Sequence, residues 1–569
     1  MTASRFTIVC GWLALLAATG FLVVFLVLPV GLTISKGVMP SALYAALAHP
    51  VYREGLFNSL AIALVSTALT VVIAVPLAWI AARYRFRGKG LCEALLLSPI
   101  ILPPFVGALG VAQLFGQYGM VNAVLANLGL VVSGQGPDWL GDHRFAAVCA
   151  IEALHLYPIL YLNTVASLSR LDPTLLEAAQ GLGASPWARF TRVVLPLVRP
   201  GLFAGGIVVF VWSFTELGTP LLLGYDRATP VQIFNGLNEL LGGNPIPFAL
   251  VVIMLAIATT LYLVARFVFL RRHDALVTKH AAVASPVTLS GWRAWLPPLA
   301  FIAVVLLAIA PHLAVVLIAT TRDWYGTVLP TGPTLVHLAG ALAHPAVVPG
   351  VVNSLIYAGG ATVLALVLGT FIAWTSARWK PFGWQALDAL AMLPLAVPGV
   401  IMAFGFVTLC YALKIGGFAT LYALLDPLSN PTLILIIAYA VRRLPHVLRA
   451  VAAGLAQVPV VYEEAAASLG AGLWCRLRRI TLPLIAGSLA AGALLTFSFS
   501  ILEVSDSLIL AQRREFFPVT KVLFDLVNIL GPGPSLACAF AVWAMLFLAS
   551  SLALAAAILG KNVSQLFRD

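Results

Sequence analysis

Charge is scarce in this sequence. Asp, Glu, Lys and Arg make up 9% of its 569 residues, hydrophobic residues make up 61%, and the mean hydropathy is +1.01. Because soluble domains carry roughly a quarter charged residues, this composition excludes a water-soluble core and predicts an integral membrane protein. The net charge of +12 resides in short loops between apolar runs, with no aromatic-interleaved basic face, so nucleic acid is not an expected partner.

Motifs for catalysis and metal binding are also missing. Six cysteines stand singly, without a CxxC pair or a His at ligand spacing, so neither a zinc site nor a disulfide framework is predicted. There is no GxxxxGK[ST] phosphate loop, since Gly88-Lys89 lacks the earlier glycine, and HExxH, GxSxG and GxGxxG are absent as well. We therefore expect no catalytic residue, no metal site and no cofactor bound by this chain.

Long apolar runs are abundant. A bilayer core needs ~20 apolar residues per helix, and the run from Ile8 to Leu32 is too long for a signal-peptide core of ~7 to 15 residues, so it is predicted to be a retained first helix. Prolines at 99, 103 and 104 predict a kinked or broken third span. The twelve predicted spans are 8–32, 56–82, 93–115, 146–169, 201–223, 247–270, 295–318, 351–377, 387–413, 431–453, 487–510 and 533–559.

Basic residues indicate the orientation, because Lys and Arg are retained on the cytoplasmic side. With the N-terminus inside, 24 of the 33 basic residues fall in cytoplasmic loops and tails and 9 in outer loops. Both termini are therefore predicted to be cytoplasmic.

The second half of the chain repeats the first. Asn58-Ser59-Leu60, Trp79 and Arg83 recur 295 residues later, and Pro158, Glu177, Gly183, Pro196 and Glu216 recur 287 residues later. Six helices per copy is an even number, so both copies enter the membrane in the same direction and form a parallel repeat. We predict a first half at 1–270, a cytoplasmic linker at 271–294 and a second half at 295–569.

One loop motif occurs in both halves, at about 170–200 and about 454–486. An alanine-rich turn favours a slim helix, a glycine lets the chain reverse, and a basic segment begins a second short helix that a proline is expected to end. The predicted result is a helix-turn-helix on the cytoplasmic face. The motif residues are Glu177, Ala178, Ala179, Gly183 and Pro196 in the first copy and Glu464, Ala465, Ala466, Gly470 and Pro483 in the second.

This pattern resembles the EAA loop of bacterial ABC-importer permeases, and the resemblance covers essentially the whole chain as two fused permease domains. It implies an all-α integral membrane protein with two tandem type I permease domains and twelve transmembrane helices in the bacterial inner membrane. In that family the loop helix sits in a groove of the ATPase. Glu177 and Glu464 would pair with a basic group there, and Gly183 and Gly470 would make the turn. The implied partners are a homodimeric ABC ATPase that holds ATP and Mg, a periplasmic solute-binding protein and membrane lipid.

The substrate stays open among several compounds. The chain looks most like permeases for ferric iron, with thiamine, 2-aminoethylphosphonate and a polyamine as alternatives. A protein of another class, an ion-driven secondary transporter, also has twelve spans in two halves, but it would not need the paired loops. The loops themselves have a simpler alternative as amphipathic hairpins without a partner.

Charges inside apolar spans are costly and usually face a cavity or an opposite charge. Glu216, Glu503 and Asp506 are candidate pathway residues on this ground, with Glu152 and His155 beside them. The alternative is that Glu216 and Glu503 bond to backbone or to hydroxyls such as those of Thr215 and Ser505. Two further charges, Arg442 and Arg443, occupy the positions of His155 and Leu156 in the repeat and are expected to snorkel toward the cytoplasm.

Overall fold

Helices account for most of the described chain. A computed structural model describes residues 5–132, 134–141, 143–169, 171–237, 244–270, 287–395 and 397–558. The only strands in these ranges form two short pairs, β1 (Tyr84–Arg85) with β2 (Val287–Thr288) and β3 (Thr321–Asp323) with β4 (Thr331–Pro333). Most of the predicted linker, 271–286, lies outside the described residues.

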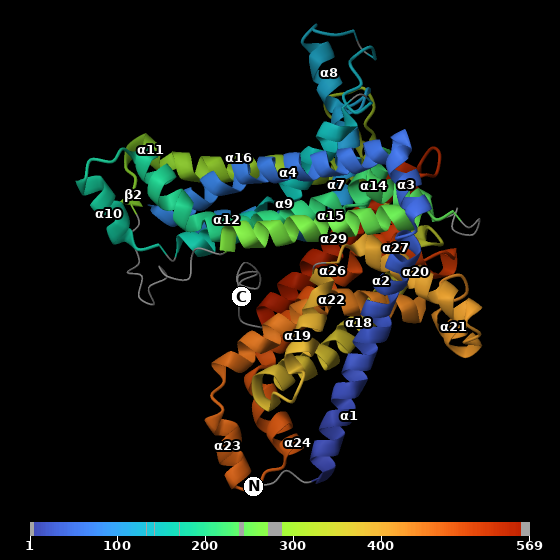
Figure 1. The fold of residues 1–569 in the computed structure, drawn as a ribbon. Coiled ribbons are helices and arrows are strands. Elements are labelled where there is room, and N and C mark those ends of the chain that lie inside the picture. Colours follow the sequence, from blue (N-terminus) through green and yellow to red (C-terminus); the bar gives the residue numbers. More distant parts are fainter. Residues whose placement is uncertain are drawn as a thin grey trace.

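The helices occur in the same order in both halves (Figure 1). The first half contains α1 (Arg5–Leu22), η1 (Val23–Val27), α2 (Leu28–Gly37), α3 (Pro40–Ala48), α4 (Pro50–Arg83), α5 (Lys89–Leu96), α6 (Ser98–Ile101), α7 (Pro104–Phe115), α8 (Met120–Asn127), α9 (Arg144–Leu168), α10 (Pro173–Gly181), α11 (Pro186–Arg189), η2 (Phe190–Val194), α12 (Leu195–Phe214), α13 (Gly218–Leu222), α14 (Thr229–Asn235) and α15 (Ile246–Leu270). The second half contains η4 (Gly291–Trp295), α16 (Leu296–Thr320), α17 (Val336–Ala343), α18 (Val347–Trp374), η5 (Thr375–Trp379), α19 (Trp384–Met392), η6 (Leu393–Leu395), α20 (Gly399–Ile415), α21 (Ala419–Leu425), α22 (Thr432–Gln457), α23 (Val461–Ser468), α24 (Leu473–Arg476), η7 (Leu477–Thr481), α25 (Leu482–Leu484), α26 (Ala486–Ile501), α27 (Ser505–Leu510), η8 (Arg514–Phe516), α28 (Val519–Val527) and α29 (Gly533–Ile558).

The described helices include eight that are long and apolar enough to cross a membrane, or up to twelve if each bent pair is one span. The predicted break near the prolines of the third span is present, since α6 ends at Ile101 and α7 begins at Pro104. The equivalent span of the second half bends by 109° between Leu395 and Gly399. Proline lacks the N–H that would continue a helix, which explains both breaks.

Each half is built on three mutually packed helices, which are α4, α9 and α12 in the first and α18, α22 and α26 in the second. Small residues such as Ala74 and Ala78 on α4 and Ala361 and Ala365 on α18 are fully buried, and they let the helices approach closely. Large apolar side chains elsewhere on these helices are exposed, as expected for lipid-facing surfaces. The internal repeat predicted from the sequence is thus a repeat of structure.

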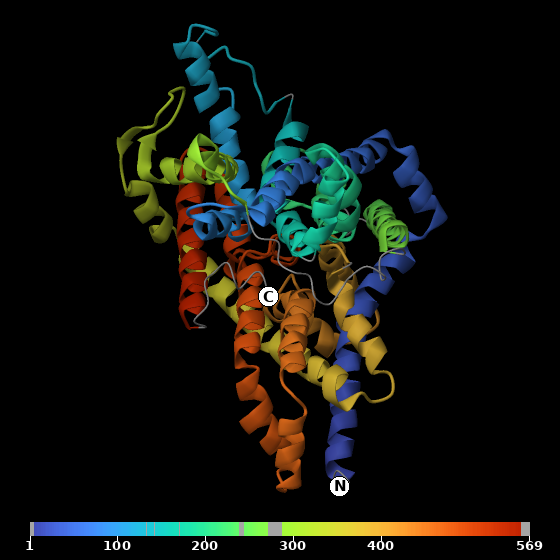
Figure 2. The same cartoon turned by 90° about the vertical axis from the view of Figure 1, so that its left-hand side faces the viewer.

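The first helix of each half packs against the other half. Helix α2 contacts α15 of its own half and α20 of the second, and α16 contacts α29 of its own half and α7 of the first. Figure 2 shows α1 running beside the helices of the second half. Glycine makes each crossing possible, because a Cβ on Gly110 would lie 1.8 Å from the Pro311 carbonyl oxygen and one on Gly405 would lie 3.1 Å from Pro29. The two halves are therefore interlocked.

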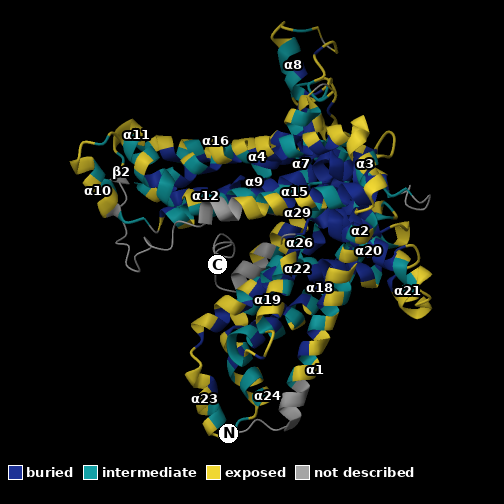
Figure 3. Cartoon of the chain, in the orientation of Figure 1, coloured by how far each residue is buried: buried dark blue, intermediate teal, exposed yellow. Residues whose placement is uncertain are grey.

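The two halves diverge from a shared region, with α10 and α11 at one far end and α23 and α24 at the other (Figure 1). Buried residues gather where the halves meet, around α7, α2 and α20 (Figure 3). The ends that carry the two EAA loops are widely separated, so the molecule is open on that side.

The crossing of α7 and α16 gives a test of this interlock. Gly110→Ala should lower the melting temperature of the detergent-purified protein, because the new methyl group meets backbone rather than a movable side chain, and such overpacking costs about 1 to 3 kcal/mol. Gly20→Ala is the matched control, since nothing lies within 4 Å of its added Cβ. Equal melting temperatures for the two variants would contradict the close crossing.

Candidate functional site

A cavity of about 190 Å³ lies where the two halves meet. Its lining comes from α9 and the end of α12 in the first half and from α22 and the end of α26 in the second. The volume is enough for several water molecules. Its ionisable lining residues are Glu152, His155, Glu216, Arg442, Arg443, His446 and Glu503.

Two helix breaks meet at this cavity. Helix α12 ends at Phe214 and α13 begins at Gly218, while α26 ends at Ile501 and α27 begins at Ser505. Glu216 and Glu503 each lie within one of these breaks. A Cβ on Gly218 would lie 3.1 Å from Val504 Cγ1, so the two breaks touch across the boundary between halves. Irregular backbone at membrane depth is tolerated where it is buried or lines a cavity.

The second half contributes a network of ion pairs. Arg442 pairs with Glu503 and, at 3.4 Å, with Asp506, and Arg443 pairs with Glu503. Arg443 also donates to the Phe499 carbonyl oxygen at 3.1 Å. Glu503 is 4% exposed and Asp506 is 0% exposed, so these charges are neutralised inside the protein.

The prediction that Arg442 and Arg443 snorkel toward the cytoplasm is therefore wrong. Sequence spacing places the arginines on α22 but does not reveal that the break after α26 brings Glu503 against them. Glu503 and Asp506 offset the cost of burying the two guanidinium groups, because an unpaired charge in a low-dielectric interior is very unfavourable.

The first half places a different set of groups at the equivalent positions. Glu216 Oε1 accepts a hydrogen bond from the Gly218 N–H at 3.0 Å, so the predicted alternative of a backbone bond is present. The Thr215 hydroxyl donates to the Val211 carbonyl oxygen instead. Glu152 is 2% exposed, and its Oε1 has no hydrogen-bond partner among the described residues.

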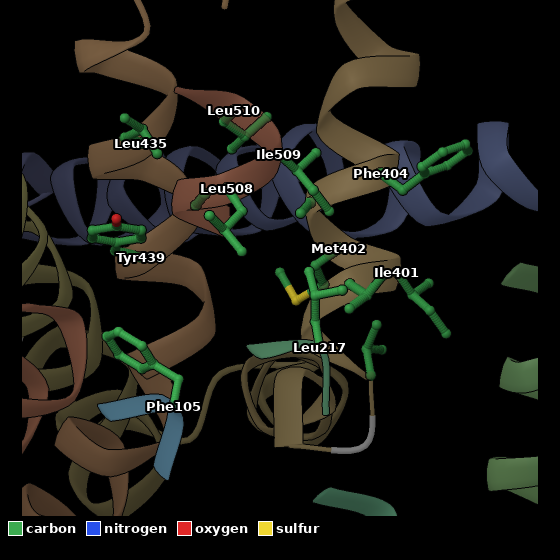
Figure 4. Packing of buried hydrophobic residues seen from close by; sticks show 14 of the residues in the cluster. Phe105, Leu217, Ile401, Met402, Phe404, Leu435, Tyr439, Leu508, Ile509 and Leu510 are labelled. Atoms are coloured by element: carbon green, nitrogen blue, oxygen red, sulfur yellow. The ribbon is translucent and has the colours of Figure 1, made fainter. Parts of the chain in front are cut away.

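An apolar cluster closes one side of the cavity. Figure 4 shows Phe105 and Leu217 from the first half among residues of α20, α22 and α27. On α22, Leu435 and Tyr439 precede Arg442 by one to two turns, and the helix then continues toward its EAA loop. The cluster therefore lies on the side of the cavity away from the EAA loops. The labelled second-half members are Ile401, Met402, Phe404, Leu435, Tyr439, Leu508, Ile509 and Leu510.

The first EAA loop contains α10 and α11. Asp172 caps α10 by accepting from the Thr174 N–H at 2.9 Å, and the hydrogen bonds from Thr174 lower the pKa of the Asp172 carboxyl. Glu177 is exposed on α10. Gly183 follows with a φ of +79°, the left-handed conformation that lets a helix end in a tight reversal.

The second EAA loop repeats this form with α23 and α24. Glu464 is exposed on α23, and Gly470 has a φ of +85°. Alanines follow each glutamate, so both helices present a carboxylate beside a small surface. Such a surface suits insertion into a groove of another protein.

The sequence prediction that Pro196 ends a short helix is wrong. Helices α11, η2 and α12 follow one another without a gap from Pro186 to Phe214, with Pro196 in the first turn of α12. The wide turn at η2, where the Leu195 N–H bonds to the Phe190 carbonyl oxygen, accommodates the ring. In the second half the helix does stop soon after Pro483, because α25 ends at Leu484 and the next helix is bent by 72°.

One residue of the second loop was missed in the sequence. Glu463 Oε1 accepts from Arg378 Nε at 3.2 Å and from the Thr481 hydroxyl at 3.0 Å, while Arg378 also donates to the Val458 carbonyl oxygen at 2.7 Å. These contacts join η5, the residue that follows α22 and both arms of the loop. The sequence contained one sign of this role, since Glu463 is a charged residue at the position where the first half of the repeat has Leu176.

The two coupling loops are therefore attached differently. Arg83 is the counterpart of Arg378, but Leu176 and Val194 replace Glu463 and Thr481, and both pack into an apolar cluster. The first loop is held by hydrophobic contact and the second by buried ion pairing.

Two interlocked helical halves, a central charged cavity and an exposed helical loop on each half define a membrane transport subunit. The family model "Binding-protein-dependent transport system inner membrane component" matches residues 74–277 and 365–557. The chain belongs to this family, with two fused domains, and it is a permease subunit of an ABC importer. It is a transport component of the inner membrane.

Ferric permeases of two bacteria align with most of this chain. A ferric transport system permease protein, FbpB 1, of Haemophilus influenzae is 27% identical over 80% of this chain and 69% of its own length. The FbpB protein of Actinobacillus pleuropneumoniae is 26% identical over 80% of this chain and 64% of its own length. This chain thus spans about two thirds of these relatives. A molybdenum ABC transporter permease of Haloferax volcanii is 30% identical over 43% of this chain and 87% of its own length.

The ion-pair network should be required for a stable fold. Glu503→Gln leaves two buried arginines without their shared carboxylate, and breaking a buried pair in this way costs about 3 to 5 kcal/mol. We expect a markedly lower melting temperature in detergent. Glu515→Gln, which loses an exposed pair with Arg513, should be near wild type. A Glu503→Gln protein as stable as this control would contradict the network.

The Glu463 contacts should hold the second loop in place. Glu463→Gln should increase protease cleavage or hydrogen exchange within 461–485, because Arg378 and Thr481 lose their shared acceptor. The matched control is Leu176→Gln, which should alter only the first loop. Unchanged exchange in the second loop would contradict this role of Glu463.

Proposed function

We propose that this chain carries ferric iron across the inner membrane from the periplasm to the cytoplasm. A periplasmic solute-binding protein delivers the iron, and a separate homodimeric ABC ATPase supplies the energy. ATP and Mg are bound by that ATPase, and this chain binds no cofactor. The observation that carries the proposal is a single chain in which two family-matched halves enclose one cavity and each exposes an EAA loop.

Two observations favour iron as the substrate. The relatives that align along both halves are ferric permeases, whereas the molybdenum permease aligns with less than half of the chain. The central site also has more acidic than basic groups, because Glu152, Glu216, Glu503 and Asp506 outnumber Arg442 and Arg443. Both arginines are already paired with carboxylates, which leaves little positive charge for an oxyanion.

The EAA loops are the contacts for the ATPase. Glu177 and Glu464 are exposed on short helices with adjacent alanines, and each would form an ion pair in a groove of one ATPase subunit. Both termini and both loops lie on the cytoplasmic side in this proposal, in line with the distribution of Lys and Arg.

ATP binding would bring the two ATPase subunits together and pull the separated EAA loops toward each other. The described conformation, with distant loops and an apolar cluster on the opposite side of the cavity, corresponds to the inward-open state. Closing the loop side would separate Phe105 and Leu217 from α20 and α27 and open the cavity to the binding protein. Transport by alternating access needs two such states, each favoured by a different ligand.

The experiment is reconstitution of this chain with its ATPase and binding protein in liposomes. We expect the iron-loaded binding protein to stimulate ATP hydrolysis and iron uptake, whereas protein loaded with molybdate, thiamine, 2-aminoethylphosphonate or putrescine should not. If the binding protein stimulates ATP hydrolysis when it is loaded with one of these other compounds, that compound and not iron is the substrate. If the chain does not associate with the ATPase, the proposed importer assembly is rejected.

Glutamate substitutions test the coupling loops. Glu177→Ala and Glu464→Ala should each reduce binding-protein-stimulated ATPase activity and uptake several-fold, and the double variant should lose both, with membrane insertion intact. Arg87→Ala is the control, since it is exposed near the same end but outside the EAA loops. Normal uptake by the double variant would reject these contacts.

A further inference from the structure

The two halves differ most at the central cavity, although they are copies. In the second half Tyr439, Arg442 and Asp506 stand where the first half has Glu152, His155 and Thr219, at the same offset of 287. The second-half groups contact one another, since Arg442 pairs with Glu503 and Asp506 and the Tyr439 hydroxyl bonds to Ser507 at 2.6 Å, although Asp506 Oδ1 has no hydrogen-bond partner among the described residues. The first-half groups have no such internal cation.

Glu152 and Glu216 are the two carboxylates that the first half contributes to the cavity. They interact with each other as like charges, and both line the cavity. Glu152 is only 2% exposed, and its Oε1 has no hydrogen-bond partner among the described residues. A buried carboxylate oxygen without a hydrogen-bond donor is unfavourable unless the group takes up a proton or a cation.

We propose that Glu152 and Glu216 form a transit site for a hard, multivalent cation inside the membrane, with His155 and Thr219 beside them. This inference rests on the proposed transport of iron and adds a substrate-binding site in the permease itself. Carboxylate oxygens and a hydroxyl are hard donors, and His155 lies one turn from Glu152 on α9 and lines the same cavity.

The cation would keep part of its hydration shell in the described conformation. Among the described residues, no three His, Cys, Asp or Glu side chains are gathered closely enough to bind a metal ion directly. The cavity has room for several waters, so water would complete the coordination. Loose binding of this kind suits a site that must release its ion at every cycle.

The paired arginines of the second half determine where the cation would sit and why the site would favour a cation over an anion. Arg442 lines the cavity from the second half, and its charge is paired there with Glu503 and Asp506. The cation would therefore sit toward the first half. An anion would be repelled by Glu152 and Glu216, because Arg442 and Arg443 are already paired with carboxylates.

Terbium luminescence tests this site, because Tb³⁺ is a hard trivalent cation and Trp212 lines the cavity as a sensitiser. The full chain in lipid nanodiscs should bind Tb³⁺ saturably, with competition by Ga³⁺ but not by molybdate. Glu152→Gln and Glu216→Gln should each weaken this binding at least tenfold, and Trp212→Phe should lower the emission without changing the affinity. Glu54→Gln, at an exposed ion pair outside the cavity, should bind as wild type.

Equal Tb³⁺ affinity in wild type and in both Gln variants would overturn the transit site, as would an absence of saturable binding to the wild type. Size-exclusion profiles and melting temperatures show whether the variants are folded. Uptake gives a second readout, since Glu152→Gln should retain ATPase stimulation by the iron-loaded binding protein but lose at least tenfold in iron uptake. Retained uptake would also overturn the site.

The transit site and the proposed function fail in different ways. If the wild type binds Tb³⁺ through Glu152 and Glu216 but its ATPase does not respond to the iron-loaded binding protein, the proposed iron import is wrong and the cation site stands. If the ATPase responds but the Gln variants bind Tb³⁺ normally, iron import stands and the site is wrong.

Discussion

The cost of placing charge inside a membrane protein governs the centre of this structure. Arg442, Arg443, Glu503 and Asp506 are all held at membrane depth, where an isolated charge is strongly unfavourable. They remain there because the break between α26 and α27 brings both carboxylates against the arginines of α22. The place where the halves meet, the cavity and the apolar cluster beside it are all arranged around these paired charges.

The interlock of the halves follows from a second constraint, which is close approach of backbones. Lipid tails provide little hydrophobic drive between helices, so helices associate through small residues and good packing. Gly110 against Pro311 and Gly405 against Pro29 are equivalent contacts in the two copies, and they fix the first helix of each half to the other. A rocking motion between halves must preserve these contacts, whereas the apolar cluster at Phe105 and Leu217 is free to separate.

Duplication has left the two halves with different tasks. The second half holds its EAA loop by the ion pair between Arg378 and Glu463 and fills its side of the cavity with paired charges. The first half holds its loop by apolar contacts of Leu176, and Glu152 Oε1 has no hydrogen-bond partner among the described residues. The cation of the proposed transit site would therefore be held by carboxylates of the first half.

From the sequence alone one can predict a membrane protein with an internal repeat and two equivalent loops. These features depend on apolar runs, on the constant offset between repeated residues and on the spacing from Glu177 to Pro196, all of which can be read along the chain. The break in the third span could also be predicted, because proline interrupts the helix in which it lies. Tertiary structure decided the rest. Which carboxylate meets Arg442, that Glu463 binds Arg378, and that η2 lets Pro196 stay inside a continuous span depend on contacts between segments far apart in sequence. Charge pairing between helices is a property of how they cross, and no periodicity within one helix encodes it.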